Sequence, residues 1–244
     1  MLNNLLNIWA TYTCENNVLI YQLGKVGSST LESSINNSIH THSLYGNPPC
    51  YVYMQQQRQG LKKLYGWLGD GIKRIALHQR KEIKIITLVR DPVDRNISMF
   101  FQDLAYWIYE YVGTVSQDTR TNEIDYLETV FEKSFDHYYI NKWFDIELKR
   151  LTGIDVFQTP FPKDRGWVVI KQGKYSVLLI EASKLTSCEP VIGDFIGRKI
   201  VLQESNAGHK KWYASLYNQF KSSFDKNAYR EKLKKTKYFK HFYG

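Results

Sequence analysis

The chain carries, at residues 18–30, the sequence Val18-Leu19-Ile20-Tyr21-Gln22-Leu23-Gly24-Lys25-Val26-Gly27-Ser28-Ser29-Thr30. Its first four residues are apolar and rich in β-branched and aromatic side chains, which predicts a short strand covered on both faces. The two glycines permit a tight turn that approaches a ligand closely, and the hydroxyl residues that follow are typical helix caps. Because a helix start offers free N–H groups and Lys25 adds a positive charge, the stretch predicts a phosphate-binding loop.

This loop differs from the nucleotide P-loop, G-x-x-x-x-G-K-[ST], in which the lysine follows the second glycine. Here Lys25 follows the first glycine, and Ser28, Ser29 and Thr30 follow the second. The pattern resembles the 5'-phosphosulfate loop of sulfotransferases that use 3'-phosphoadenosine 5'-phosphosulfate (PAPS). Taken alone, the same residues also fit an ordinary glycine turn between a strand and a helix.

A second informative stretch begins in the last two residues of the strand predicted over residues 84–89. It reads Leu88-Val89-Arg90-Asp91-Pro92-Val93-Asp94-Arg95-Asn96-Ile97-Ser98. It resembles the 3'-phosphate motif of sulfotransferases, in which an arginine ends a strand and a serine lies eight residues later in the next helix. Arg90 and Ser98 have that spacing, so both could reach one phosphate. By itself, Arg90 could instead pair with Asp94.

Found together and in this order, the two motifs favour a PAPS-dependent sulfotransferase. The alternatives are a P-loop-type nucleotide kinase and a non-enzymatic, basic nucleic-acid-binding α/β protein. The position of Lys25 and the lack of a strand-end aspartate suited to Mg²⁺ count against the kinase. A nucleic-acid-binding protein would not need the Gly24-Lys25 loop, and we expect no nucleic-acid partner.

Sulfuryl transfer places the acceptor oxygen and the leaving phosphate in line, as phosphoryl transfer does. It therefore needs a cation near the bridging oxygen and a base for the acceptor proton. Lys25 is the predicted cation, while Gly24, Gly27 and the hydroxyls of residues 28–30 are predicted to hold the 5'-phosphate. Because these donors already stabilise the leaving phosphate, we expect no metal.

His42 is the predicted base, because it ends the second predicted strand beside the loop and an imidazole pKa of about 6.5 suits proton acceptance near neutral pH. Some glycan sulfotransferases place a histidine or a glutamate at the end of the corresponding strand. His40 lies two residues earlier on the same strand face and is the other candidate. A histidine that is only hydrogen-bonded at a strand end is a third interpretation.

Strands alternate with helices along the chain, which predicts a parallel, doubly wound sheet with ligands at the carboxyl ends of its strands. Strands are predicted over residues 18–21, 39–44, 84–89, 167–171 and 176–180, with a weaker one over 199–202. Together with the sulfotransferase resemblance, this gives one domain over residues 1–244, a P-loop-like three-layer α/β/α domain with a central parallel sheet.

The spacing of apolar residues also predicts several helices. Helices are expected over residues 31–38, 61–68, 93–111 and 136–151, followed by two near the C-terminus, and residues 115–122 are expected to form a loop. Gly69-Asp70-Gly71 should break the second helix, and Gly153 should follow the end of the fourth. The basic, aromatic C-terminal region is predicted to be a solvated helix whose aromatic residues pack on the domain.

Three later segments resemble a bacterial family of capsular polysaccharide synthesis proteins. They are Asn141-Lys142-Trp143-Phe144-Asp145, Leu151-Thr152-Gly153-Ile154-Asp155-Val156 and Lys211-Trp212-Tyr213. The resemblance implies that the acceptor is a hydroxyl of a saccharide, such as a capsular or other cell-surface glycan precursor. Trp143 and Trp212 could stack on a sugar or on adenine, although aromatic residues on helical faces are more often core residues.

The 244 residues carry a net charge of +9 and are 43% hydrophobic, which suits a folded domain with an anionic ligand. No apolar run is long enough to cross a membrane, and the first residues do not resemble a signal peptide. Cys14, Cys50 and Cys188 form no C-x-x-C pair, so they predict neither a disulfide framework nor a zinc site. These features predict a cytoplasmic protein.

Overall fold

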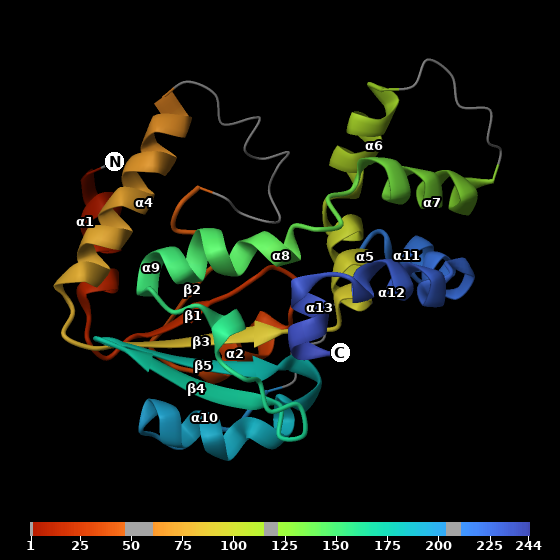
Figure 1. The fold of residues 1–244 in the computed structure, drawn as a ribbon. Coiled ribbons are helices and arrows are strands. Elements are labelled where there is room, and N and C mark those ends of the chain that lie inside the picture. Colours follow the sequence, from red (N-terminus) through yellow and green to blue (C-terminus); the bar gives the residue numbers. More distant parts are fainter. Residues whose placement is uncertain (1, 47–60, 115–121, 204–210) are drawn as a thin grey trace.

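The computed structural model describes residues 2–46, 61–114, 122–203 and 211–244. The chain adopts a mixed α/β fold around a five-stranded sheet with the strand order β2-β1-β3-β5-β4 (Figure 1). The strands are β1 (Val18–Tyr21), β2 (Ser38–Thr41), β3 (Ile83–Val89), β4 (Trp167–Gln172) and β5 (Tyr175–Glu181). The five main strand predictions are therefore confirmed, with small shifts in their ends.

The sheet is parallel except at one edge, where β4 runs antiparallel to β5. The predicted parallel sheet is confirmed for the other strand pairs, and β4 differs because the two-residue connection Gly173-Lys174 can join only antiparallel strands. The predicted strand over residues 199–202 is not formed. Two amides in and beside this segment donate to side chains instead of to a neighbouring strand: Leu202 N to Glu189 Oε2 (2.8 Å) and Gln203 N to Ser34 Oγ (2.8 Å).

The order of the strands creates a switch point between β1 and β3. From β1 the chain moves to β2 on one side, and it then returns to β3 on the other side. The connections after β1 and after β3 therefore diverge at the carboxyl ends of these two strands, which is where open α/β sheets bind ligands. The loop of residues 22–27 and Arg90 both lie at that switch point, since they directly follow β1 and β3.

Helices cover both faces of the sheet (Figure 1), with α10 on one side and α1, α4 and α8 on the other. The helices are α1 (Leu2–Thr13), α2 (Ser28–Ser34), α4 (Leu61–Gln79), α5 (Pro92–Gln102), α6 (Leu104–Val112), α7 (Glu123–Ser134), α8 (Ile140–Trp143), α9 (Arg150–Thr152), α10 (Glu189–Ile196), α11 (Ala214–Ser223), α12 (Lys226–Lys234) and α13 (Lys237–Phe242). None of the described helices has the length and apolar character needed to cross a bilayer.

Several helix predictions need correction. The break predicted at residues 69–71 is wrong, because α4 continues through it. Helix α1 packs closely there, with Ile8 Cδ1 4.0 Å from the position that a Gly69 Cβ would occupy. The helix predicted over residues 93–111 is divided at Asp103, whose ψ of 31° ends α5. The first predicted helix ends at Ser34, and residues 115–121 of the predicted loop lie outside the described residues.

The C-terminal half also differs in detail. The helix predicted over residues 136–151 consists of α8, a π-helix over Phe144–Lys149 and α9, and Gly153 follows it with a φ of 77°. Three helices rather than two end the chain, and their aromatic residues are buried as predicted: Tyr229, Tyr238, Phe239 and Phe242. Helices α5, α6, α7, α11 and α12 enclose a second group of buried apolar side chains beside the sheet core.

Candidate functional site

The loop after β1 has the backbone conformation expected of a tight turn. Lys25 has a φ of 68° and Gly27 a φ of 103°, both in the left-handed region. Helix α2 begins directly after the loop, but its N-cap is Gly27, and no side chain caps it. The prediction that Ser28, Ser29 or Thr30 caps this helix is therefore wrong. Of these three residues, Ser28 and Thr30 are half-buried and Ser29 is exposed.

Two arginines from the second motif hold this loop. Arg90 Nη1 donates to Lys25 O (3.0 Å), and Arg95 Nε donates to Gly24 O (3.1 Å). The alternative pairing of Arg90 with Asp94 is not formed, because Asp94 Oδ1 lies 3.3 Å from Lys221 Nζ. The two sequence motifs therefore meet at the switch point between β1 and β3. Arg95, whose side chain is buried, was missed, because it lies off the apolar helix face that the spacing of Val93 and Ile97 predicts.

Arg90 is itself held by the C-terminal helix α13. The hydroxyl of Tyr238 accepts a hydrogen bond from Arg90 N and donates one to Arg90 O, both at 3.0 Å. Burial raises the pKa of Tyr238, so this hydroxyl stays protonated. The end of the chain thus fixes the backbone of Arg90, which no local sequence pattern indicated. Ser98, the other residue of the predicted 3'-phosphate motif, is half-buried on α5.

A second lysine lies close to Lys25. Gln102 Oε1, at the end of α5, accepts hydrogen bonds from Lys25 Nζ (3.4 Å) and from Lys211 Nζ (2.7 Å). In the sequence, Lys211 stood out only as part of the segment Lys211-Trp212-Tyr213. Two ammonium groups that share one amide oxygen repel each other in the absence of an anion, so this arrangement suits an anionic ligand.

Asp103 follows Gln102 in the break between α5 and α6. Burial raises the pKa of its carboxyl from 3.8 to about 7, and the charges of Lys25 and Arg95 counteract this effect only in part. Its Oδ2 atom is buried and has no hydrogen-bond partner among the described residues. A carboxyl with a pKa near neutrality beside a lysine is a candidate acid or base. No sequence pattern distinguished Asp103 from an ordinary turn residue.

His42 follows the end of β2, as predicted, and its ring contacts His40 with 4.5 Å between centroids. Its Nδ1 atom lies 2.9 Å from Gln22 O, so Nδ1 carries the proton and Nε2 is the basic nitrogen. Burial lowers the pKa of His42 to about 4. His40 Nδ1 lies 3.1 Å from Glu32 Oε2, and burial lowers the pKa of His40 as well.

Glu147, on the π-helix, fixes the segment that follows His42. Its buried carboxylate accepts hydrogen bonds from Ser43 Oγ (2.9 Å), Leu44 N (2.8 Å), Tyr45 N (3.3 Å) and the hydroxyl of Tyr21. The residue was missed, although its position among the apolar residues of the predicted helix over 136–151 was a usable signal.

The two tryptophans named from the sequence have different surroundings. Trp143 is a core residue with no exposed surface, and its Nε1 donates to His42 O (2.9 Å). It therefore supports His42 and is not available for stacking on a ligand. Trp212 is 75% exposed and follows Lys211 directly.

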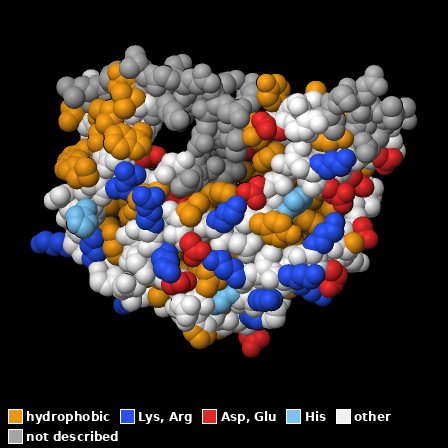
Figure 2. All heavy atoms as spheres, turned by 45° about the horizontal axis from the view of Figure 1, so that its top comes forward, with side chains coloured by type: hydrophobic (Ala, Val, Ile, Leu, Met, Phe, Trp, Pro, Cys, Tyr) orange, Lys and Arg blue, Asp and Glu red, His pale blue; other side chains and the backbone are white. Residues whose placement is uncertain are grey.

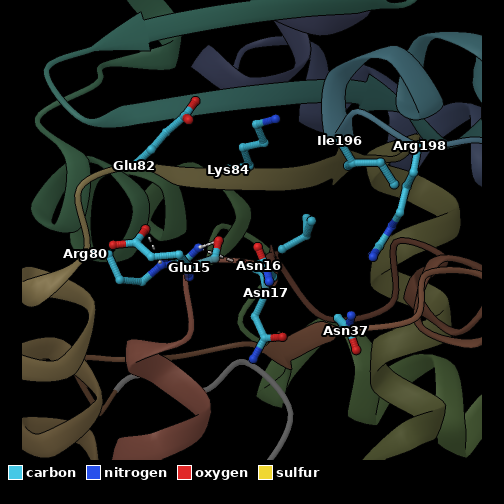
Figure 3. A pocket seen from close by; sticks show the side chains of 10 residues that line it. Glu15, Asn16, Asn17, Asn37, Arg80, Glu82, Lys84, Ile196 and Arg198 are labelled. Atoms are coloured by element: carbon cyan, nitrogen blue, oxygen red, sulfur yellow. Dashed lines mark hydrogen bonds and ion pairs between the residues drawn. The ribbon is translucent and has the colours of Figure 1, made fainter.

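A pocket of about 460 Å³ lies at the opposite end of the sheet (Figure 3). It is lined by Glu15, Asn16, Asn17, Val18, Asn37, Arg80, Glu82, Lys84, Ile196 and Arg198. Because Val18 and Lys84 lie at the amino ends of β1 and β3, this pocket includes no predicted site residue.

Cys14 and Cys188 are free thiols, and Cys50 lies outside the described residues. Within the described ranges, no three His, Cys, Asp or Glu side chains are grouped to hold a metal.

No curated protein and no solved structure matches the chain. One family model matches residues 117–244, which are more than half of the chain. The matched region supplies Trp143, Glu147, Lys211 and Tyr238, whereas Lys25, His42 and Arg90 precede it. The chain thus belongs to the family described as "Putative capsular polysaccharide synthesis protein".

Proposed function

We propose that this protein is a sulfotransferase that moves the sulfuryl group of PAPS to a hydroxyl of a saccharide. The observation that carries the proposal is the contact between the two motifs. The guanidinium groups of Arg90 and Arg95 hydrogen-bond the backbone of the Gly24-Lys25 turn, at the switch point where α/β sheets bind ligands. This arrangement suits a ligand with one phosphate at each motif, such as the nucleotide of PAPS.

The proposed chemistry assigns the leaving group to Lys25. In the transfer, the bond from sulfur to the bridging phosphate oxygen breaks, and the acceptor oxygen bonds to sulfur. Negative charge grows on the leaving phosphate, where a positioned ammonium group stabilises it. Gly24, Gly27 and the hydroxyls of residues 28–30 hold the 5'-phosphate, and Arg90 with Ser98 holds the 3'-phosphate. Lys211, which shares Gln102 with Lys25, adds a second cation.

The acceptor proton goes to one of two groups that differ in pKa. His42 has a basic Nε2 and a fixed ring, but its pKa of about 4 makes it a weak base at neutral pH. Asp103, with a pKa of about 7, matches neutral pH better. The saccharide acceptor is supported by membership in a polysaccharide synthesis family, and the exposed ring of Trp212 is a surface on which a sugar could stack.

Calorimetric titration with adenosine 3',5'-bisphosphate and with adenosine 5'-phosphate tests the nucleotide assignment. Arg90→Ala should weaken binding of the bisphosphate by about 1.5–3 kcal/mol, because charge-assisted hydrogen bonds to the 3'-phosphate are lost. Binding of the monophosphate should change much less. Lys25→Ala should weaken binding of both ligands, since both carry the 5'-phosphate.

Arg198→Ala is the matched control, because it removes the same charge from the pocket at the opposite end of the sheet. It should leave both affinities unchanged. Equal losses for the two nucleotides in Arg90→Ala would show that Arg90 does not bind a 3'-phosphate, and the sulfotransferase assignment would lose its main support.

A further inference from the structure

Helices α1 and α4 together expose an unusual number of large apolar side chains. Of the twelve exposed large apolar residues among the described side chains, seven lie on this helix pair. They are Leu6, Trp9, Leu64, Tyr65, Trp67, Leu68 and Ile75, and we call them the apolar patch. Figure 2 shows hydrophobic side chains gathered in this part of the molecule. A patch of this kind on a soluble domain marks an interaction surface.

The patch is separate from the packing of the two helices against the protein. In α4, Ala76 and Leu77 are fully buried, whereas Leu64, Leu68 and Ile75 share an outward stripe at helical spacing. In α1, Leu6 and Trp9 lie three residues apart and are 56% and 39% exposed. Surface helices normally direct polar residues outward, so packing among the described residues does not explain the patch.

The charges of the helix pair indicate which type of partner the apolar patch would bind. Helix α1 has no charged residue, and α4 has four basic residues and one acidic residue. The acidic residue, Asp70, is paired with Lys73 at 2.9 Å. A second copy of this chain would present the same positive charge and a net charge of +9, which opposes self-association through this face. A negatively charged surface is complementary to it.

The residue types favour a lipid surface. Tryptophan and tyrosine are enriched where a bilayer meets water, and the patch contains Trp9, Trp67 and Tyr65. Apolar and aromatic residues beside lysines are typical of helices that lie in the membrane interface. We propose that the α1–α4 pair docks on an anionic membrane surface, with the apolar patch inserted at the boundary between headgroups and acyl chains. This inference is independent of the proposed sulfotransferase activity.

Flotation with phosphatidylcholine vesicles, with and without phosphatidylglycerol, tests the proposal on the full chain. The protein should float with the vesicles that contain phosphatidylglycerol, and raising the salt concentration should weaken this binding. Trp67→Ala should lower the partition coefficient about tenfold. Leu64→Glu with Trp67→Glu should lower it by about a hundredfold or more, because the change also adds negative charge.

Val201→Glu is the matched control, because Val201 and Trp67 are both 66% exposed and Val201 lies outside the helix pair. It should retain vesicle binding, and circular dichroism should show that all variants are folded. Failure to bind phosphatidylglycerol vesicles would overturn the proposal, as would equal losses in Val201→Glu. Light scattering that detects a dimer lost in the Leu64→Glu, Trp67→Glu variant would assign the patch to a second copy instead.

Discussion

Glu147→Ala, on the π-helix beside the sheet, should be strongly destabilising. The change removes the carboxylate that accepts hydrogen bonds from Tyr21, Ser43, Leu44 and Tyr45. The Leu44 amide and the Tyr21 hydroxyl are buried, and each unsatisfied buried donor costs about 1–3 kcal/mol. We therefore expect the free energy of unfolding to fall by about 3–5 kcal/mol. That loss is large compared with a typical total of about 5–15 kcal/mol.

Urea unfolding followed by circular dichroism measures this difference. Glu147→Gln retains the shape and one acceptor oxygen, so its loss should be smaller than that of Glu147→Ala. Glu231→Ala is the surface control, because Glu231 is exposed and pairs only with Lys234 among the described residues. Its effect should stay within about 0.5 kcal/mol. A loss below about 1 kcal/mol in Glu147→Ala would refute the conclusion that Glu147 organises the segment after His42.

The remaining predictions concern the loop and the two candidate bases. Gly27→Ala should lower the free energy of unfolding by about 1–2 kcal/mol, because a residue with a side chain is strained at a φ of 103°. A clash does not add to this loss, because the nearest atom to an added Cβ, Leu88 Cδ1, is 3.9 Å away. Thermal unfolding measures the change. Burial raises the folded-state pKa of Asp103 from 3.8 to about 7, so the free energy of unfolding of the wild type should fall as the pH rises between these values. In Asp103→Asn the free energy of unfolding should differ much less between pH 4 and pH 8, and urea titrations at these two pH values measure it. If Asp103 is the base, the rate of sulfate transfer should rise through about pH 7, whereas His42 as the base would give a rate that is already level above about pH 5. If His42 is the base, His42→Ala should retain nucleotide affinity and lose about 10²–10⁴-fold in turnover.

Local patterns predicted β1, β3 and β5 well because each of these strands is a short, strongly apolar run. Residues 84–89 illustrate this, since β3 is buried almost throughout. The errors arose where tertiary contacts outweigh local preference. Glycines 69 and 71 do not end α4, because α1 packs against the helix at Gly69. The segment over 199–202 forms no strand, because side chains bind the amide of Leu202 and that of the adjacent Gln203.

For the candidate site, the sequence indicated the parts that are contiguous in the chain. The loop at Lys25, the position of His42 after β2 and Arg90 at the end of β3 could all be placed by strand ends. Lys211 could not, because it reaches Lys25 only through the fold, by way of Gln102. The raised pKa of Asp103 likewise depends on burial that only the packed helices create.

Thermal unfolding with adenosine 3',5'-bisphosphate, ATP–Mg²⁺ and a DNA oligomer in parallel tests the central claim most directly. At a hundredfold excess over its dissociation constant, the bisphosphate should stabilise the folded protein by about 2.7 kcal/mol. It should do so in the presence of EDTA, and Arg90→Ala should abolish its advantage over adenosine 5'-phosphate. A larger shift of the melting temperature with ATP–Mg²⁺ than with the bisphosphate would contradict the sulfotransferase proposal and favour a nucleotide kinase, and a larger shift with DNA would favour a nucleic-acid-binding protein.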